Sequence, residues 1–204
     1  MQRRRILTLF LVLGMVVVYS CGGGSGPGSP GSSNTGNIGG YVTITDISHS
    51  SPKGDQGDGW QIDMVQDMCS GGTAEVWGDD TANLTVSLNS YDKKIPANTI
   101  FIQRYTVEYT QQIYELDLPP VKMFDLTTTV MVQPDKSSPV NIVVMDAGTK
   151  QEYMKELNSE KYNPTRLAPY LYDMKITLYG VDSLGNTFNV PVHRTVSLAD
   201  YNYC

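Results

Sequence analysis

Few side chains in this sequence have the type and spacing that enzymatic chemistry needs. His49 and His193 are the two histidines, and neither belongs to a recognisable nucleophile or metal motif. His193 falls on the polar side of Val192 in a predicted strand, which indicates a solvated sheet residue. No Gly-x-Ser-x-Gly is present, and no spacing motif sets two carboxylates at a defined separation. We therefore expect a protein without enzymatic activity and without a cofactor.

The strongest metal candidate is the segment "KGDQGDGWQID". It offers carboxylate oxygens from Asp55, Asp58 and Asp63, and calcium prefers six to eight oxygen ligands. Asp79 and Asp80 form a second acidic pair that would strengthen the site if the two loops converged. The spacing is not that of an EF-hand loop, however. A plain turn, whose Asp-Gly pairs suit left-handed backbone, is the preferred interpretation.

Aromatic side chains form the other group of candidates. Exposed aromatic rings stack on sugars or anchor protein partners, but they more often fill a sandwich core or pack at a strand end, and we favour the core. The polar loop "SHSSPKGDQGDG" is the expected recognition surface, because loops usually carry recognition on such scaffolds. The aromatic candidates are Trp60, Trp77, Tyr170, Tyr172, Tyr179, Tyr201 and Tyr203.

The N-terminus has the pattern of an export signal. Three consecutive arginines, Arg3 to Arg5, precede an uncharged apolar run from Ile6 to Tyr19. A helix needs about 20 apolar residues to span a bilayer, and this run is shorter. We therefore expect residues 1–20 to be a signal peptide.

The end of the apolar run resembles the lipobox of bacterial lipoproteins. Val18 and Ser20 stand three and one residues before Cys21, although Tyr19 departs from the usual small residue. The resemblance implies that Cys21 is diacylated and becomes the new N-terminus. Two acyl chains hold a protein on a membrane durably. The alternative is cleavage by an ordinary signal peptidase, which leaves a free thiol.

A glycine-rich linker follows the cysteine. Gly22, in place of aspartate, implies an outer-membrane destination in a host with two membranes. Residues 21–40 form the lipidated cysteine and linker, and Gly22 to Gly40 contains nine glycines and no charge. A chain of this composition has an r.m.s. span of about 25 Å. We expect it to tether a single domain, residues 41–204, at the membrane surface.

The charge of the mature chain narrows the class of partners. The full chain has a net charge of −6, from 15 basic and 21 acidic residues, and loss of three arginines with the signal peptide makes it −9. An acidic surface repels nucleic acid and anionic headgroups. We therefore expect no nucleic-acid partner, membrane contact through the lipid anchor, and an envelope protein as the candidate partner. The sequence leaves the oligomeric state open.

The remaining cysteines form an even pair. If Cys21 carries lipid, Cys69 and Cys204 are left in an oxidising compartment, and we expect a disulfide between them. This disulfide would also hold the last residue of the chain in place.

Residues 41–204 alternate between apolar and polar side chains, which is typical of short β-strands. The segment 140–145 is apolar on both faces and is expected to be a central strand. Pro191 indicates an edge or a bulge in the last strand. The predicted strands cover 41–48, 60–68, 83–90, 103–110, 124–132, 140–145, 172–180 and 187–198.

One helix interrupts the strands. Thr149 and Glu152 form a Thr-x-x-Glu capping box. Tyr153, Met154 and Leu157 then fall on one helical face, and Asn158 ends the helix. We expect this short helix to cover one end of the sheets.

These elements predict an all-β protein, a β-sandwich of about eight strands with one short helix insertion. The segments "YTVEY" and "YDMKITLYGVDSLGN" resemble strand C, and strand F with its turn to strand G, of fibronectin type III and other immunoglobulin-like domains. The resemblance covers about a quarter of the chain. It implies a Greek-key topology, with Tyr172 as the tyrosine of the corner before strand F.

The combined features predict a membrane-tethered, non-catalytic lipoprotein of the cell envelope with a structural or protein-binding role. The alternative is a tethered module that binds a glycan or calcium.

Overall fold

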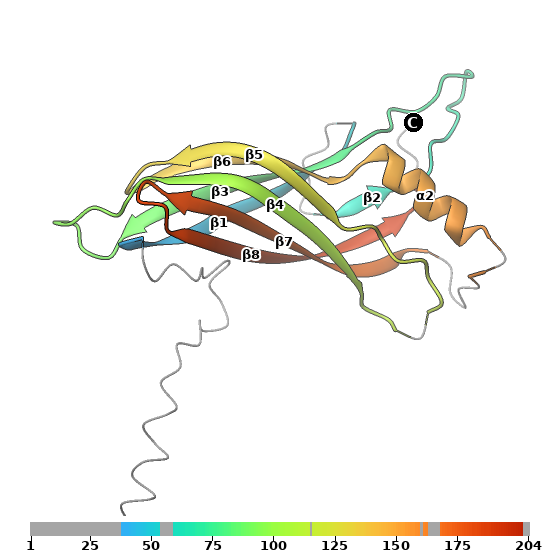
Figure 1. The fold of residues 1–204 in the computed structure, drawn as a ribbon. Helices are drawn as coiled ribbons and strands as arrows, with labels where there is room; N and C mark the ends of the chain where they lie inside the picture. The colour runs from blue at the N-terminus through green and yellow to red at the C-terminus, as the bar shows by residue number, and fades with distance from the viewer. Residues whose placement is uncertain (1–37, 54–58, 115, 160, 163–167, 202–204) are drawn as a thin grey trace, which may run out of the picture.

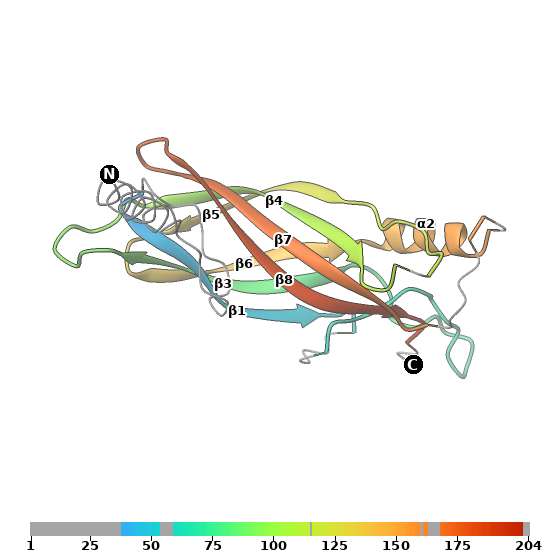
Figure 2. The same ribbon diagram turned by 90° about the horizontal axis from the view of Figure 1, so that it is seen from below.

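The computed structural model describes residues 38–53, 59–114, 116–159, 161–162 and 168–201. These residues form a mostly-β domain of two sheets with one short helix (Figures 1 and 2). The predicted signal peptide, Cys21 and most of the linker lie outside this part of the chain. Within it, no helix has the length and apolar character needed to cross a bilayer.

The smaller sheet has three antiparallel strands in the order β1-β3-β6. Strand β1 spans Gly40–Ser50, β3 spans Asp80–Ser90, and β6 spans Lys136–Met145. The expectation that 140–145 is a central strand was wrong, because β6 is an edge strand of this sheet. Its inner face is buried through Val140, Ile142 and Val144, while Asn141 on the outer face is exposed.

The larger sheet has five strands in the order β2-β8-β7-β4-β5. Its strands are β2 (Gln61–Asp63), β4 (Ile100–Gln111), β5 (Phe124–Val132), β7 (Tyr170–Asp182) and β8 (Thr187–Ala199). Strand β2 is shorter than predicted and runs parallel to β8, beside Ser197 to Ala199. Around Pro191, β8 therefore pairs on one side alone, with β7. The proline stands at a local sheet edge, as predicted.

Side chains from both sheets fill a common core, which is why the alternating sequences fold this way. In β7, Tyr172, Met174, Ile176 and Leu178 are buried at every second position. The main contributors from the opposite sheet are Val42, Ile44, Leu84, Val86, Leu88, Val140, Ile142 and Val144.

Helix α2, Ala147–Leu157, forms where a helix was expected, but it begins earlier than the capping box indicates. Asp146 is the N-cap, and its Oδ1 accepts a hydrogen bond from the Thr149 backbone N–H at 2.6 Å. Thr149 is itself buried inside the first turn. Asn158 ends the helix as predicted.

The domain has two ends with different structures (Figure 2). At one end the chain enters β1, with Ile38 buried and Gly40 so close to the Asn89 carbonyl that a Cβ atom would collide with it. We call this the entry end. It also carries the loop 91–98 and the turn 183–186, because β3 ends there and β7 turns into β8 there.

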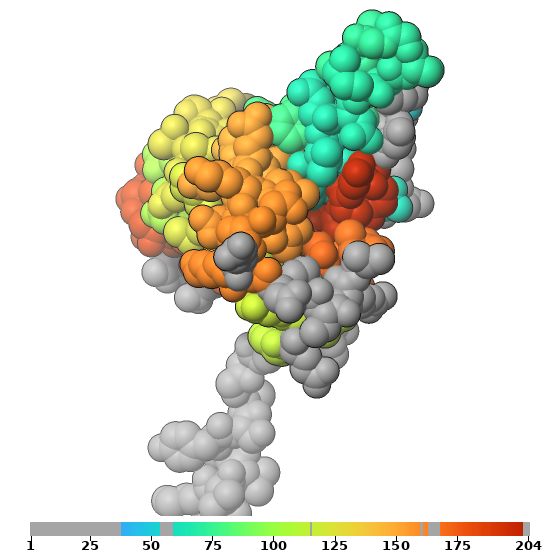
Figure 3. All heavy atoms as spheres, turned by 90° about the vertical axis from the view of Figure 1, so that its right-hand side faces the viewer, coloured from blue at the N-terminus to red at the C-terminus, as the bar shows by residue number. Residues whose placement is uncertain are grey.

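The opposite end, called here the helix end, comprises α2, the segment 64–79, the connection 112–123 and the last residues of β8 (Figures 1 and 3). Strand β1 runs from one end toward the other over 11 residues. At about 3.3 Å per residue, the strand spans roughly 35 Å.

Candidate functional site at the helix end

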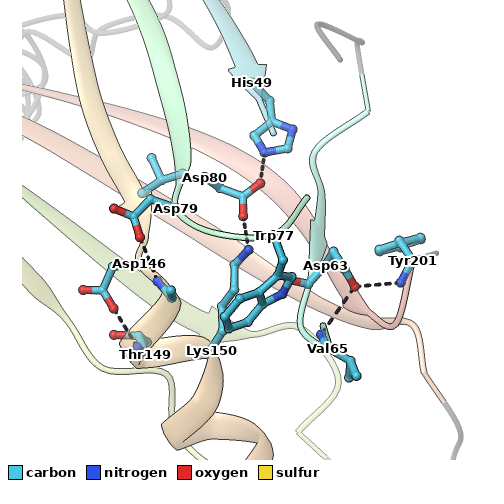
Figure 4. A network of polar contacts seen from close by, with 12 residues as sticks. His49, Asp63, Val65, Trp77, Asp79, Asp80, Asp146, Thr149, Lys150 and Tyr201 are labelled. Carbon is cyan, nitrogen blue, oxygen red and sulfur yellow. Dashed lines mark hydrogen bonds and ion pairs between the residues drawn. The ribbon is translucent and has the colours of Figure 1, made fainter. Parts of the chain in front are cut away.

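A buried cluster of charged side chains lies beneath helix α2 (Figure 4). The Lys150 Nζ atom lies 2.7 Å from Asp80 Oδ2, and His49 Nε2 lies 2.6 Å from Asp80 Oδ1. Asp80 and Lys150 are 0% exposed, and His49 is 2% exposed. The cluster thus joins the end of β1, the start of β3 and the first turns of α2.

Two tryptophans contact the cluster. The Lys150 ammonium stands 5.0 Å from the centroid of the Trp77 ring, in a cation–π contact. The His49 ring lies 5.3 Å from the ring of Trp60. Neither Asp80 nor His49 nor Lys150 lines either of the two pockets found beside α2 among the described residues. The ion pair and the cation–π contact thus fix the first turns of α2 on β3 and on the segment 64–79.

Asp63 lies next to this cluster through Trp77, whose Nε1–H donates to the Asp63 carbonyl at 3.2 Å. The Asp63 carboxylate accepts the backbone N–H of Tyr201 at 2.9 Å and that of Val65 at 3.4 Å, both through Oδ1. Its Oδ2 atom is buried without a hydrogen-bond partner. Burial raises the pKa of Asp63 to about 6, against the lowering effect of the two backbone hydrogen bonds.

The raised pKa of Asp63 predicts a pH-dependent stability. The folded protein holds the Asp63 proton more tightly than the unfolded chain, whose pKa is 3.8, so stability rises as the pH falls from about 7 toward 4. An amide keeps the oxygen that accepts both N–H groups and carries no charge. We expect Asp63→Asn to raise the free energy of unfolding by about 2 kcal/mol at pH 7.5 and to remove this part of the pH dependence.

Urea unfolding at pH 7.5 and pH 5.0 measures the effect of Asp63→Asn. Asp46→Asn, at an exposed position of β1, is the matched control. The explanation is wrong if the two variants show the same stability and the same pH dependence.

Two pockets flank helix α2. One, of about 370 Å³, lies between the Pro120–Lys122 segment and the helix, and Glu152, Tyr153 and Glu156 line it. The other, of about 300 Å³, is lined by Met64, Gln66 and Trp77 on one side and by Gln151 and Met154 on the other. Both combine aromatic or aliphatic surface with a few polar groups, which is typical of binding surfaces.

Large apolar side chains are also exposed at the helix end. Met68 and Val76 are exposed on the segment 64–79, which projects from the helix end in Figure 3. Tyr114 and Met123 are exposed on the connection between β4 and β5. Such side chains, surrounded by polar residues, commonly mark protein contact sites.

Tyr172 stands near the start of β7 and is buried, at the position that the immunoglobulin-like resemblance implied. Its hydroxyl donates to the Pro119 carbonyl at 3.3 Å and lies 3.1 Å from the Tyr153 hydroxyl of α2. The partner segments are thus α2 and the connection between β4 and β5. A corner tyrosine instead bonds the backbone a few residues upstream.

The two histidines lie in different environments. His193 is exposed on β8 and pairs with Asp173 at 2.9 Å, as expected for a solvated sheet residue. His49 is buried against Asp80, which no sequence motif indicated. Lys150, the centre of the cluster with Asp80, was not among the sequence candidates.

The other candidates have mixed outcomes. Asp55 and Asp58 lie outside the described residues, so the calcium hypothesis stays untested, and the described residues contain no group of three or more metal-ligating side chains. Asp79 accepts the backbone N–H of Ala147 at 2.9 Å.

The aromatic candidates differ in their burial. Those buried in the core are Trp60, Tyr170 and Tyr172. Those half-buried are Trp77, Tyr179 and Tyr201, and Tyr203 lies outside the described residues.

Cys69 lies half-buried at the start of a turn in the segment 64–79, where its carbonyl accepts the Gly72 backbone N–H at 3.0 Å. Cys204 and Cys21 lie outside the described residues, so the pairing stays a prediction. The last strand nevertheless runs toward Cys69. Burial raises the pKa of Asp200, and the neighbouring carboxylates of Asp67 and Glu75 raise it further.

Compared with known proteins, the chain matches no family model, no curated protein and no solved structure.

Proposed function

We propose that this protein is a non-catalytic lipoprotein of the cell envelope, anchored in the outer membrane through Cys21, whose helix end binds a protein partner. The signal peptide, lipobox and glycine linker of the sequence support the anchor. The position of the start of β1 supports the placement of the binding surface.

The observation that carries the proposal is the opposite placement of the two ends. A linker that joins β1 at Ile38 and Gly40 attaches to the entry end, and the helix end lies at the far end of the domain (Figure 1). A partner can therefore reach the exposed apolar residues of the helix end without steric hindrance from the membrane. The buried cluster around Lys150 fixes α2 on the sheets, and a surface that is formed before binding has a lower entropic cost of binding.

The fold proposed for the domain is immunoglobulin-like. The sheet order β1-β3-β6 corresponds to strands A, B and E, and the order β8-β7-β4-β5 corresponds to strands G, F, C and C′. Helix α2 then takes the place of the connection between strands E and F. This correspondence supports the resemblance that the segments "YTVEY" and "YDMKITLYGVDSLGN" carry.

Site-specific photocrosslinking in cells tests both parts of the proposal. A benzophenone amino acid in place of Val76 or Tyr114 is expected to give one discrete protein adduct in the membrane fraction, because both positions lie at the helix end. The same amino acid in place of Asn141, exposed on β6, is the control and should not give that adduct. The Cys21→Ala variant should leave the membrane fraction.

The lipid anchor and the binding surface would each be contradicted by a different result. If Cys21→Ala stays in the membrane fraction, the lipid anchor is wrong. If the adducts at Val76 and Tyr114 equal those at Asn141, the helix end is not the binding surface.

A further inference from the structure

A second group of exposed apolar side chains lies at the entry end, where the sequence places the linker. Tyr91 is 65% exposed, Ile95 is 70% exposed and Leu184 is 74% exposed. Tyr91 and Ile95 belong to the loop after β3, and Leu184 is in the turn between β7 and β8. Together with the exposed Lys93 and Lys94, we call these residues the entry surface.

Hydrogen bonds hold the loop and the turn side by side. The Ser183 backbone N–H donates to the Thr99 carbonyl at 2.9 Å, and the Asn98 side chain donates to Asp182 at 2.8 Å. The Tyr91 backbone N–H donates to the carbonyl of Gly39, which precedes β1. The entry surface is therefore contiguous with the point where the linker joins the domain.

Charge is distributed unevenly between the two ends. At the entry end, Asp92, Asp135 and Asp182 each accept backbone N–H groups through a side-chain oxygen, and three exposed lysines accompany them: Lys93, Lys94 and Lys136. In or next to the helix end, four lysines of the described chain, Lys122, Lys150, Lys155 and Lys161, stand against ten acidic residues: Asp63, Asp67, Glu75, Asp79, Asp80, Asp117, Asp146, Glu152, Glu156 and Asp200. Although the whole chain has a net charge of −6, the acidic and basic residues at the entry end balance, so anionic headgroups do not repel this end.

We infer that the entry surface docks on the lipid bilayer, with Tyr91, Ile95 and Leu184 in the headgroup region and Lys93 and Lys94 near anionic lipid phosphates. This inference rests on the proposed lipid anchor. A tyrosine ring suits the interface because one side is apolar and its hydroxyl is polar.

Because the linker holds the entry surface close to the membrane, weak contacts with lipid are sufficient for docking. Residues 22–37 separate the anchor from the described domain, and a glycine-rich chain of this length spans about 20 to 25 Å. Such a tether keeps the entry surface at an effective concentration near the millimolar range at the membrane. Docking would point the helix end away from the bilayer, where a partner reaches it.

Fluorescence quenching by brominated lipids tests the docking. The mature chain, residues 21–204, is coupled through the Cys21 thiol to a maleimide lipid in vesicles of phosphatidylethanolamine and phosphatidylglycerol. Because the tether is chemical, the result does not depend on lipidation in the cell. Leu184→Trp and Ile95→Trp place a reporter on the entry surface, and Val76→Trp at the helix end is the matched control.

We expect brominated lipid to quench most of the fluorescence that the introduced tryptophan contributes in Leu184→Trp and Ile95→Trp, and none of the fluorescence that it contributes in Val76→Trp. Reversing the charge of Lys93 and Lys94 to glutamate should lower the ratio of docked to undocked protein by about tenfold or more. High salt should act in the same direction.

Three results would overturn the inference. Equal quenching at positions 184 and 76 would exclude a preferred orientation, and absence of quenching at both positions would exclude docking. Quenching that disappears as the protein density on the vesicle rises would show that a second copy of the chain, and not lipid, covers the entry surface. Release of Cys21→Ala from membranes in cells tests the anchor separately.

Discussion

Substitution of Lys150 by methionine is expected to lower the free energy of unfolding by about 3–5 kcal/mol. The change removes the ammonium that lies 2.7 Å from Asp80 Oδ2 and leaves a buried carboxylate with His49 as its remaining hydrogen-bond partner. Methionine fills a similar volume, so the loss of stability comes from the unpaired charge more than from a cavity. Urea unfolding monitored by circular dichroism measures it.

Two further variants separate the charge from the packing. Lys155→Met changes an exposed lysine of the same helix and should alter the stability by less than about 0.5 kcal/mol. The double variant Asp80→Asn/Lys150→Met removes both charges and keeps an acceptor for His49, so it should be more stable than Lys150→Met alone. A double variant no more stable than Lys150→Met would contradict the ion-pair explanation.

Loss of the predicted disulfide should have an effect of similar size. Cys204→Ser is expected to lower the free energy of unfolding by about 4 kcal/mol, because the bond to Cys69 would close a loop of more than a hundred residues in the unfolded chain. The structure brings the end of β8 alongside the segment 64–79: the Met64 backbone N–H donates to the Ala199 carbonyl at 2.8 Å.

The pairing predicts a specific pattern among cysteine variants. Cys69→Ser, Cys204→Ser and the double variant should have the same stability, because each removes the same bond, and a reductant should bring the wild type to that level. Peptide mapping without reductant identifies the bond directly. A Cys69 peptide linked to Cys21, or a Cys204→Ser variant as stable as the wild type, would show that the pairing is wrong.

The secondary structure was largely predictable because it depends on local alternation. The buried positions of β7, from Tyr172 to Leu178, follow the period of two in the sequence, as a strand with one face on a core requires. The apolar face of α2 likewise follows from Tyr153, Met154 and Leu157. The helix start was misplaced because two capping residues, Asp146 and Thr149, compete within one turn.

The placement of β6 could not be derived in the same way. A run that is apolar at nearly every position favours a central strand. Val140, Ile142 and Val144 instead face the core, and Val143 on the other side is half-buried and donates its backbone N–H to the Tyr105 hydroxyl. The decision depends on which strands lie beside β6, and this is a long-range property.

The sequence contains one local signal for the charged cluster. Lys150 stands three residues before Tyr153 and four before Met154, so it belongs to the apolar stripe of the helix. A lysine in that position indicates a buried acidic partner, but the identity of the partner does not follow from it. Asp80 and His49 are 70 and 101 residues earlier in the chain.

The sequence by itself determined the β-rich class of the domain, its one helix and the pattern of the N-terminal segment, because each depends on residues close together in the chain. Tertiary structure alone decided that His49, Asp80 and Lys150 meet beneath α2. It also decided that the chain enters the domain at the end opposite that helix. Both properties depend on strand order and pairing, which bring together residues far apart in the chain and which local sequence patterns do not specify.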